Sequence, residues 1–294
     1  FVQDDWRATN WLTLNFGLRY ELQTPLTEAS GRLGNFVPEL GQVVVAGDPR
    51  LPAGLINTDK NNWGPRAGFA LRPFKDDKTV IRGGAGIYYS LETFNPIRQQ
   101  LANNAPFLQR ETYSRPTAAA SILQLSFQNP FPSSLISAGV STPFGLQVDY
   151  QTPEIYQFNL TVERQLVEDL ALEVGYVGSQ GRFLGQRYDL NIAYPTGAVT
   201  STTTGGETTY TPVTARLFPT LGTIQYQEQI ANSSYHGLQT SLRRRSRNGL
   251  TLLVSYTFSK AIDTASSTNN STTGTQKFPQ DVRDLNAEKG LSDF

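Results

Sequence analysis

Residues 11–22 alternate strictly between two kinds of side chain, and this alternation constrains the fold more than any other feature. The even positions hold Leu12, Leu14, Phe16, Leu18, Tyr20 and Leu22, whereas the odd positions from 13 to 21 hold Thr, Asn, Gly, Arg and Glu. Successive side chains of a β-strand point to opposite faces, so this pattern predicts one long strand with a continuous apolar face.

The same period recurs along the chain. Alternating segments occupy residues 63–72, 79–89, 156–166, 170–178, 235–244 and 250–258, and a weaker one occupies residues 1–7. Short connections near residues 8–10, 73–78, 167–169 and 246–249 carry turn-forming residues and join these segments in pairs. We therefore predict an all-β antiparallel meander of about eight long strands in sequence order, with no parallel neighbours and no substantial helix.

The connections alternate strictly between short and long. Loops as long as those between the predicted hairpins are uncommon in compact domains, whereas short turns on one side and long loops on the other are typical of transmembrane β-barrels. Eleven residues at about 3.3 Å each, tilted by about 40°, rise by about 28 Å, which matches an apolar band of about 25 Å. A soluble β-sandwich is the alternative, but it needs neither strands nor loops of this length.

Composition excludes several classes of site. Twenty-five Lys and Arg balance 25 Asp and Glu, which argues against electrostatic binding of nucleic acid. The chain has no Cys and one His, so disulfides, thiolate chemistry and His-rich metal sites are excluded. We expect no enzyme activity and no cofactor. The absence of Met, even at position 1, leads us to expect a piece of a longer protein.

The alternation assigns side chains to two environments. The residues expected to face lipid are Leu12, Leu14, Phe16, Leu18, Phe69, Leu160, Leu172, Leu252 and Val254. Aromatic residues expected at the water–lipid boundary are Trp6, Trp11, Tyr20, Trp63, Tyr89, Tyr176 and Tyr256. In a structure without lipid, Leu12, Leu14, Phe16 and Leu18 should be more exposed than Asn15 and Arg19 wherever other residues crowd the lumen.

The opposite faces predict a polar lumen. Its charged candidates are Arg19, Glu21, Arg66, Arg72, Arg82, Glu163 and Glu173. Glu163 and Glu173 are equally far from residue 168 in a short turn, so they are expected to lie opposite each other. Paired carboxylates can catalyse glycoside hydrolysis. They can also be wall charges that an Arg on a neighbouring strand compensates, which is the interpretation we favour.

Four further motifs are interpreted as structural. Residues 83–86 (Gly-Gly-Ala-Gly) continue into a strand, not a helix, so they do not match a dinucleotide-binding loop. The basic run at residues 243–247 is expected to be a solvated turn near lipid head groups. His236 is expected to begin a strand and to stand alone. The acidic residues of the last segment lack calcium-loop spacing and glycine: Asp281, Asp284, Glu288 and Asp293.

Nine short stretches, in order along nearly the whole chain, resemble the barrel of TonB-dependent outer-membrane receptors of the Oar-like group. They are Phe1-Val-Gln-Asp-Asp-Trp6, Leu12-Thr-Leu-Asn-Phe-Gly-Leu-Arg-Tyr-Glu21, Asn62-Trp-Gly-Pro-Arg-Ala-Gly-Phe69, Thr79-Val-Ile-Arg-Gly-Gly-Ala-Gly-Ile-Tyr-Tyr89, Gln157-Phe-Asn-Leu-Thr-Val-Glu-Arg-Gln-Leu166, Val174-Gly-Tyr-Val-Gly-Ser179, Ser233-Ser-Tyr-His-Gly-Leu-Gln239, Ser255-Tyr-Thr-Phe-Ser-Lys260 and Gly290-Leu-Ser-Asp-Phe294.

The resemblance implies a barrel of about 22 strands, of which residues 1–294 supply about eight, without the plug, the TonB-binding box or the closing strand. It implies the outer membrane of a Gram-negative-type bacterium, contact with outer-membrane lipid, TonB and plug as partners through the missing parts, and an external ligand bound by the long loops. The implied function is import of a bulky nutrient such as a siderophore, an oligosaccharide or a peptide. A passive or adhesive surface barrel is the alternative. We expect a curved open sheet with the long loops on one side.

Overall fold

The computed structural model describes residues 1–90, 101–108, 128, 141–204, 207–245, 249, 251–266 and 278–293. Its strands are β1 (Val2–Trp6), β2 (Leu12–Tyr20), β3 (Gly34–Val37), β4 (Gln42–Val45), β5 (Trp63–Leu71), β6 (Thr79–Tyr89), β7 (Phe144–Leu146), β8 (Glu154–Val167), β9 (Leu170–Asp189), β10 (Tyr194–Thr204), β11 (Glu207–Ala215), β12 (Gln225–Arg245), β13 (Thr251–Asp263) and β14 (Gly290–Leu291). Two short 3₁₀ helices are η1 (Pro38–Leu40) and η3 (Leu285–Glu288).

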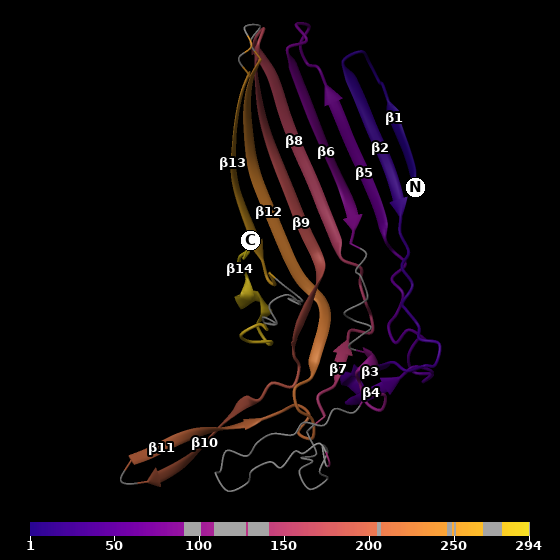
Figure 1. The fold of residues 1–294 in the computed structure, drawn as a ribbon, viewed down its shortest axis with the longest axis vertical. Coiled ribbons are helices and arrows are strands. Elements are labelled where there is room, and N and C mark those ends of the chain that lie inside the picture. The colour runs from indigo at the N-terminus through magenta and orange to yellow at the C-terminus, as the bar shows by residue number, and fades with distance from the viewer. Residues whose placement is uncertain are drawn as a thin grey trace.

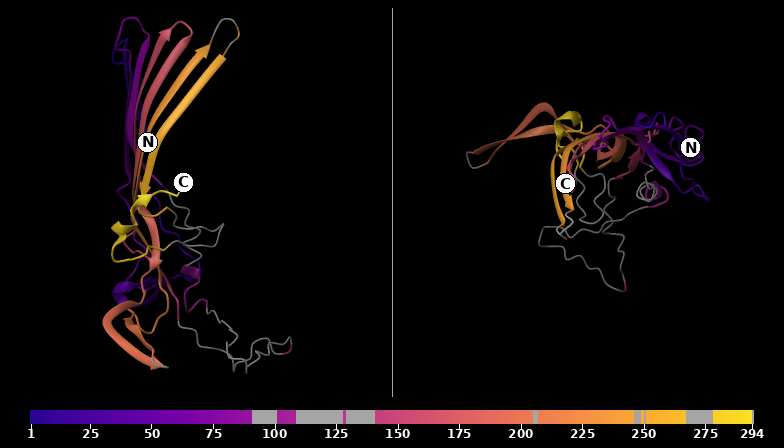
Figure 2. Two further views of the ribbon diagram at one scale, coloured as in Figure 1. Left: turned by 90° about the vertical axis from the view of Figure 1, so that its left-hand side faces the viewer. Right: turned by 90° about the horizontal axis from the view of Figure 1, so that it is seen from above.

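The eight predicted strands are all present, and they form one sheet in sequence order. The order is β1-β2-β5-β6-β8-β9-β12-β13-β14, and every long strand is antiparallel to its neighbours. Figure 1 shows the long strands side by side, with the short turns at one end and the long connections at the other. Figure 2 shows that the sheet is curved and open, as expected.

Local turn chemistry fixes the register of the hairpins. In the first turn, Thr9 Oγ1 accepts hydrogen bonds from the backbone N–H groups of Trp11 and Leu12 at 3.2 and 3.0 Å. In the second turn, Asp77 adopts a left-handed conformation with φ of 53°, which Asp tolerates better than most residues. The fourth predicted turn, at residues 246–249, lies outside the described residues except for Gly249.

Strands β9 and β12 are longer than predicted, with 20 and 21 residues. The alternation predicts strands only over residues 170–178 and 235–244, because residues 179–189 and 225–234 do not alternate. A tilted transmembrane strand needs only about 9–11 residues, so each strand extends well beyond one span. The extensions pair with each other through two register shifts between Gln229 and Ser233. They carry the sheet into the region of the long connections (Figure 1).

The long connections fold together into a unit that we call the cap, formed by residues 21–62, 101–108, 141–153, 190–193 and 216–224. It has an apolar core of its own, comprising Leu33, Leu55, Ile56, Leu101, Phe144, Leu146 and Tyr150. Phe36 from the first connection meets Phe218 from the third edge to face, with ring centroids 5.3 Å apart. The cap is therefore an ordered structure at one end of the sheet.

Buried asparagines connect these segments to one another through hydrogen bonds. Asn35 Nδ2 donates to the carbonyl oxygens of Leu55 and Leu146 at 3.2 and 2.9 Å, and the backbone N–H of Leu146 donates back to Asn35 Oδ1 at 2.7 Å. Asn104 makes the same kind of bridge between Gly34 and Phe144. Because buried polar groups without partners are costly, each amide side chain holds two distant segments in one arrangement.

The expectation of no parallel neighbours is wrong at one place. The short strand β7 pairs with β12 in parallel, from Phe144 with Gln225 to Leu146 with Gln227. This pairing fills the side of the β12 extension that no long strand covers. A further hairpin, β10–β11, is rich in Thr and projects away from the cap (Figure 1).

Candidate functional site

The register sorts the side chains of the long strands onto two faces. One row across the sheet, followed through the strand pairs, contains Leu14, Phe69, Gly83, Leu160, Tyr176, Leu238 and Phe258. All nine residues predicted to face lipid lie on this face, which we call the apolar face, and the opposite one we call the polar face. Their contact with lipid stays a prediction.

The exposure of β2 follows the expected order only in part. Phe16 and Leu18 are 49% and 44% exposed, whereas Asn15 is half-buried. Leu12 and Leu14 are also half-buried, and the Arg19 side chain is 51% exposed. Arg19 departs from the expectation because an open, curved sheet leaves its polar face uncrowded at this end.

The predicted boundary aromatics divide into three groups. Trp6 and Trp11 flank the first short turn, whereas Tyr20, Trp63 and Tyr89 lie together at the loop ends of their strands. The Tyr20 and Trp63 rings are 4.5 Å apart, and the Tyr89 hydroxyl donates to the Trp63 carbonyl at 3.2 Å. Tyr176 and Tyr256, in contrast, lie within β9 and β13 and not at strand ends.

The predicted charged residues of the lumen share the polar face or follow its strand ends. Glu163 lies directly opposite Glu173, as predicted. Arg82 Nη1 contacts Glu163 Oε2 at 3.1 Å, so an arginine on the neighbouring strand compensates one of the two carboxylates. Three other members find partners at strand ends: Arg19 pairs with Glu21, and Arg72 Nη1 lies 3.5 Å from Asp77 Oδ1.

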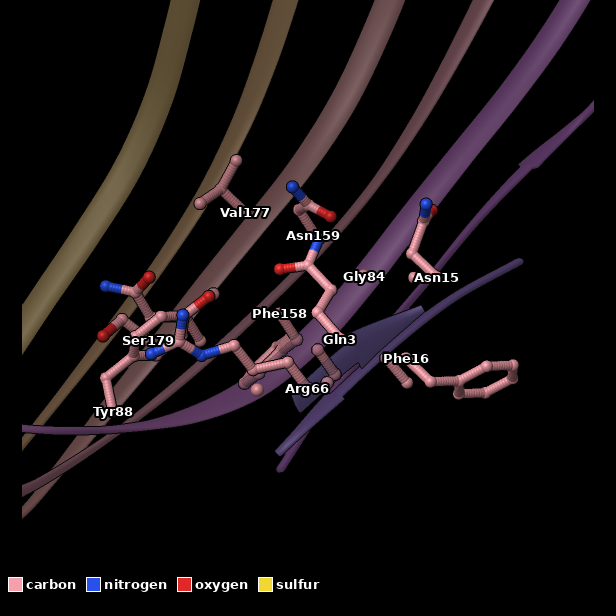
Figure 3. A pocket seen from close by; sticks show the side chains of 17 residues that line it. Gln3, Asn15, Phe16, Arg66, Gly84, Tyr88, Phe158, Asn159, Val177 and Ser179 are labelled. Atoms are coloured by element: carbon pink, nitrogen blue, oxygen red, sulfur yellow. The ribbon is translucent and has the colours of Figure 1, made fainter. Parts of the chain in front are cut away.

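A hollow of about 410 Å³ lies on the polar face between β1 and β9. Neutral amides and hydroxyl groups surround it, and Figure 3 shows Gln3, Asn15, Asn159 and Ser179 around the hollow while the Phe16 ring points away from them. Its floor is formed by glycines on adjacent strands, among them Gly68 and Gly84. Because these glycines have no side chains, the polar groups around the hollow can face a ligand or another part of the protein.

One arginine at this hollow has a fixed position. The Arg66 guanidinium lies over the Tyr88 ring, 4.2 Å from its centroid. Gly86 is paired with Arg66 across the strands, and a Cβ there would meet Arg66 Cγ at 3.0 Å and Tyr88 Cε2 at 3.3 Å. Gly86 therefore provides the space that this cation–π contact needs.

Two tyrosines at the cap end of the sheet are held in their protonated form. Burial raises the pKa of Tyr188, and the hydrogen bond that its hydroxyl donates to Glu228 Oε2 at 2.6 Å raises it further. Burial and the charge of Glu228 also raise the pKa of Tyr226. Both hydroxyls therefore stay protonated to higher pH than the hydroxyl of an ordinary tyrosine.

His236 is not at the start of a strand and does not stand alone, contrary to expectation. It lies in the middle of β12, where its Nδ1 is 2.6 Å from the Tyr176 hydroxyl oxygen and its ring stacks on that of Tyr176. Periodicity identified neither this contact nor the asparagine bridges of the cap. Among the described residues, no group of three or more His, Cys, Asp or Glu side chains could hold a metal ion.

No helix within the described ranges is long and apolar enough to span a membrane.

Comparison with protein families identifies the class of the sheet. The family model of the outer membrane beta barrel domain matches residues 1–294. The chain belongs to this family. Its localisation is therefore the outer membrane, and the sheet of this barrel domain is not closed in this structure. Comparison with curated proteins finds no match.

Solved outer-membrane proteins resemble this barrel domain at low identity. They include the transporter YddB from Escherichia coli (9% identity, TM-score 0.40, covering 90% of this chain and 33% of that one). The siderophore receptor PirA from Pseudomonas aeruginosa is similar (10% identity, TM-score 0.37, 89% and 35% covered). The FrpB iron transporter from Neisseria meningitidis is a third (9% identity, TM-score 0.40, 88% and 34% covered). The chain spans about a third of the length of each.

Proposed function

We propose that residues 1–294 are part of the barrel wall of an energised outer-membrane transporter of the TonB-dependent, Oar-like kind. The apolar face contacts lipid, the polar face lines the lumen, and the cap contributes to the external ligand site. The parent protein has a plug and engages TonB through segments outside this chain. It imports a bulky nutrient of the siderophore, oligosaccharide or peptide class, and the chain itself has no enzyme activity.

The observation that carries the proposal is the combination of a two-faced sheet with a folded cap at one end. A passive pore needs a polar lumen but no ordered structure over its mouth. Here the cap has its own core and buried asparagine bridges. An ordered cap can present fixed contacts to a ligand at a modest cost in entropy. The hollow beneath it offers amides, hydroxyl groups and Arg66 to a ligand or a plug.

An uptake experiment tests the proposal. Cells that express the parent protein are given labelled ferric siderophores, oligosaccharides and peptides, with and without an intact TonB system. We expect one class to accumulate only when both the parent protein and TonB are present. Accumulation that persists without TonB would contradict energised import.

The alternative function is adhesion, and the β10–β11 hairpin favours it. This hairpin projects from the cap, and Val199 and Tyr210 on it are 57% and 70% exposed. The register places both on one face of the hairpin. Deletion of residues 196–213 separates the two functions, because adhesion should be lost while import persists. Loss of import alone would count against the adhesive role.

A further inference from the structure

The apolar face ends earlier on β9, β12 and β13 than on β2 and β5. On β2 and β5 it continues to Tyr20 and Trp63 at the loop ends. On β12 and β13 the row after Leu238 and Phe258 contains His236 directly opposite Lys260. The row of His236 and Lys260 crosses β2 at Phe16, which lies two rows before Tyr20 on the same face. Polar side chains therefore begin two rows earlier on β12 and β13 than at the end of β2.

A pocket of about 260 Å³ lies immediately beyond this row. Its lining includes Gln180, Arg182 and Ser234 from the strands, and Asn286 and Lys289 from the segment around η3. Arg182 and Lys289 are both exposed. Within the described part of the chain, neither forms an ion pair with a carboxylate. The Arg182 guanidinium rests over the Tyr156 ring at 5.2 Å, which holds it at the face of the sheet.

His236 and Lys260 lie one row from this pocket. They face each other across β12 and β13, and the next row on the same face contains Gln180 and Ser234, which line the pocket. His236 Nδ1 lies 2.6 Å from the Tyr176 hydroxyl oxygen, and this contact fixes the imidazole beside the pocket.

Acidic groups also lie near these donors. Glu154 is paired in register with Arg182, and its carboxylate accepts a hydrogen bond from Tyr156 at 2.7 Å. Asp263 lines the pocket, is buried, and accepts hydrogen bonds from Ser266 at 2.9 and 3.1 Å. Of the charged residues that line the pocket, the cations Arg182 and Lys289 outnumber the carboxylate of Asp263, so the pocket suits an anion.

We propose that this pocket binds the phosphate headgroup of an outer-membrane lipid. The phosphate accepts hydrogen bonds from Arg182 and Lys289, with His236 and Lys260 at its membrane side. The acyl chains of the lipid lie along the adjacent apolar face, where Leu238 and Phe258 are 45% and 67% exposed. A lipid fits this site because anion donors adjoin an apolar surface directly. The inference rests on the lipid-facing assignment of the apolar face and not on transport.

Lipid titration of the intact parent protein in detergent tests the proposal. The probes are phosphatidic acid and diacylglycerol with the same acyl chains, and native mass spectrometry counts the bound lipids. We expect phosphatidic acid to bind and the phosphate-free diacylglycerol to bind at least about tenfold more weakly. Equal binding of the two lipids would overturn the proposal.

Matched variants locate the site. Arg182→Gln with Lys289→Gln should weaken phosphatidic acid binding about tenfold or more, because two charged donors are lost. Arg50→Gln removes an exposed arginine of the cap that does not line the pocket, and phosphatidic acid binding should be unchanged. Unchanged binding in the double variant would refute the site, and Lys260→Gln gives the same test if the double variant does not fold.

Inorganic phosphate separates a lipid from a free anion. We expect millimolar phosphate to leave the bound phosphatidic acid largely in place, because the acyl chains add apolar contact. Full displacement would mean that the pocket holds a free anion and would overturn the lipid assignment. Binding of phosphatidic acid without TonB-dependent uptake would refute the proposed function only.

Discussion

Replacement of Asn35 by alanine should open the cap without unfolding the sheet. The change removes three buried hydrogen bonds and leaves the N–H of Leu146 and the carbonyls of Leu55 and Leu146 without this partner. Each buried polar group left unpaired costs about 1–3 kcal/mol. One N–H group and two carbonyl groups that lose this partner together give about 3 kcal/mol, at the low end of that range.

Hydrogen exchange of the intact parent protein measures this loss. A reduction of about 3 kcal/mol in the free energy of local opening accelerates exchange about a hundredfold, since about 1.4 kcal/mol corresponds to a factor of ten. The acceleration should be confined to peptides of the cap that contain Leu55 or Leu146, whereas β2 and β5 should be unaffected.

Asn57→Ala is the matched control. Asn57 Nδ2 donates to Asp149 Oδ1 at 2.6 Å, but this hydrogen bond is exposed, so its loss should cost less than about 1 kcal/mol. If the cap peptides of Asn35→Ala exchange at the same rate as those of the wild-type protein, buried asparagines do not hold the cap together.

Three further predictions follow from the strands. Leu14→Arg should destabilise the folded barrel by about 2–4 kcal/mol in a bilayer folding assay if Leu14 lies near the midplane, and a neutral result would contradict its lipid-facing assignment. Gly64→Ala should lower the melting temperature of the parent protein, because a Cβ there would lie 2.7 Å from the backbone oxygen of Ile87, whereas Gly84→Ala has its nearest contact at 3.4 Å and should be tolerated. The isolated chain should aggregate or fail to insert into liposomes, because its two open edges leave backbone groups unpaired in hydrocarbon. A heat-modifiable, protease-resistant species with discrete conductance would show the opposite.

The membrane-spanning part of the fold could be predicted because it follows from local pattern. The alternation at residues 12–20 determines a strand and its two faces, and the turn residues limit how neighbouring strands pair. The position of Glu163 opposite Glu173 followed from equal distances to one turn. These inferences need only residues close in sequence or strands joined by a short turn.

The cap and the outer-face pocket could not be predicted, because their contacts are distant in sequence and have no period. The hydrogen bonds of Asn35 with Leu146 join residues 111 positions apart. Residues 179–189 of β9 lack alternation, and Phe183 within them has a left-handed φ of 54°. The pairing of His236 with Tyr176 depends on the register of two strands that a long connection separates.

Cysteine scanning of β2 tests the two-faced wall most directly. Residues 1–294 have no native Cys, so a single cysteine introduced at one of positions 12 to 18 is the only one in this part of the parent protein. In outer membranes, a water-soluble thiol reagent should label positions 13, 15 and 17, and a lipid-soluble quencher should reach positions 12, 14, 16 and 18. Labelling without a period of two, or with the opposite phase, would contradict the assignment of the apolar face to lipid and the polar face to the lumen.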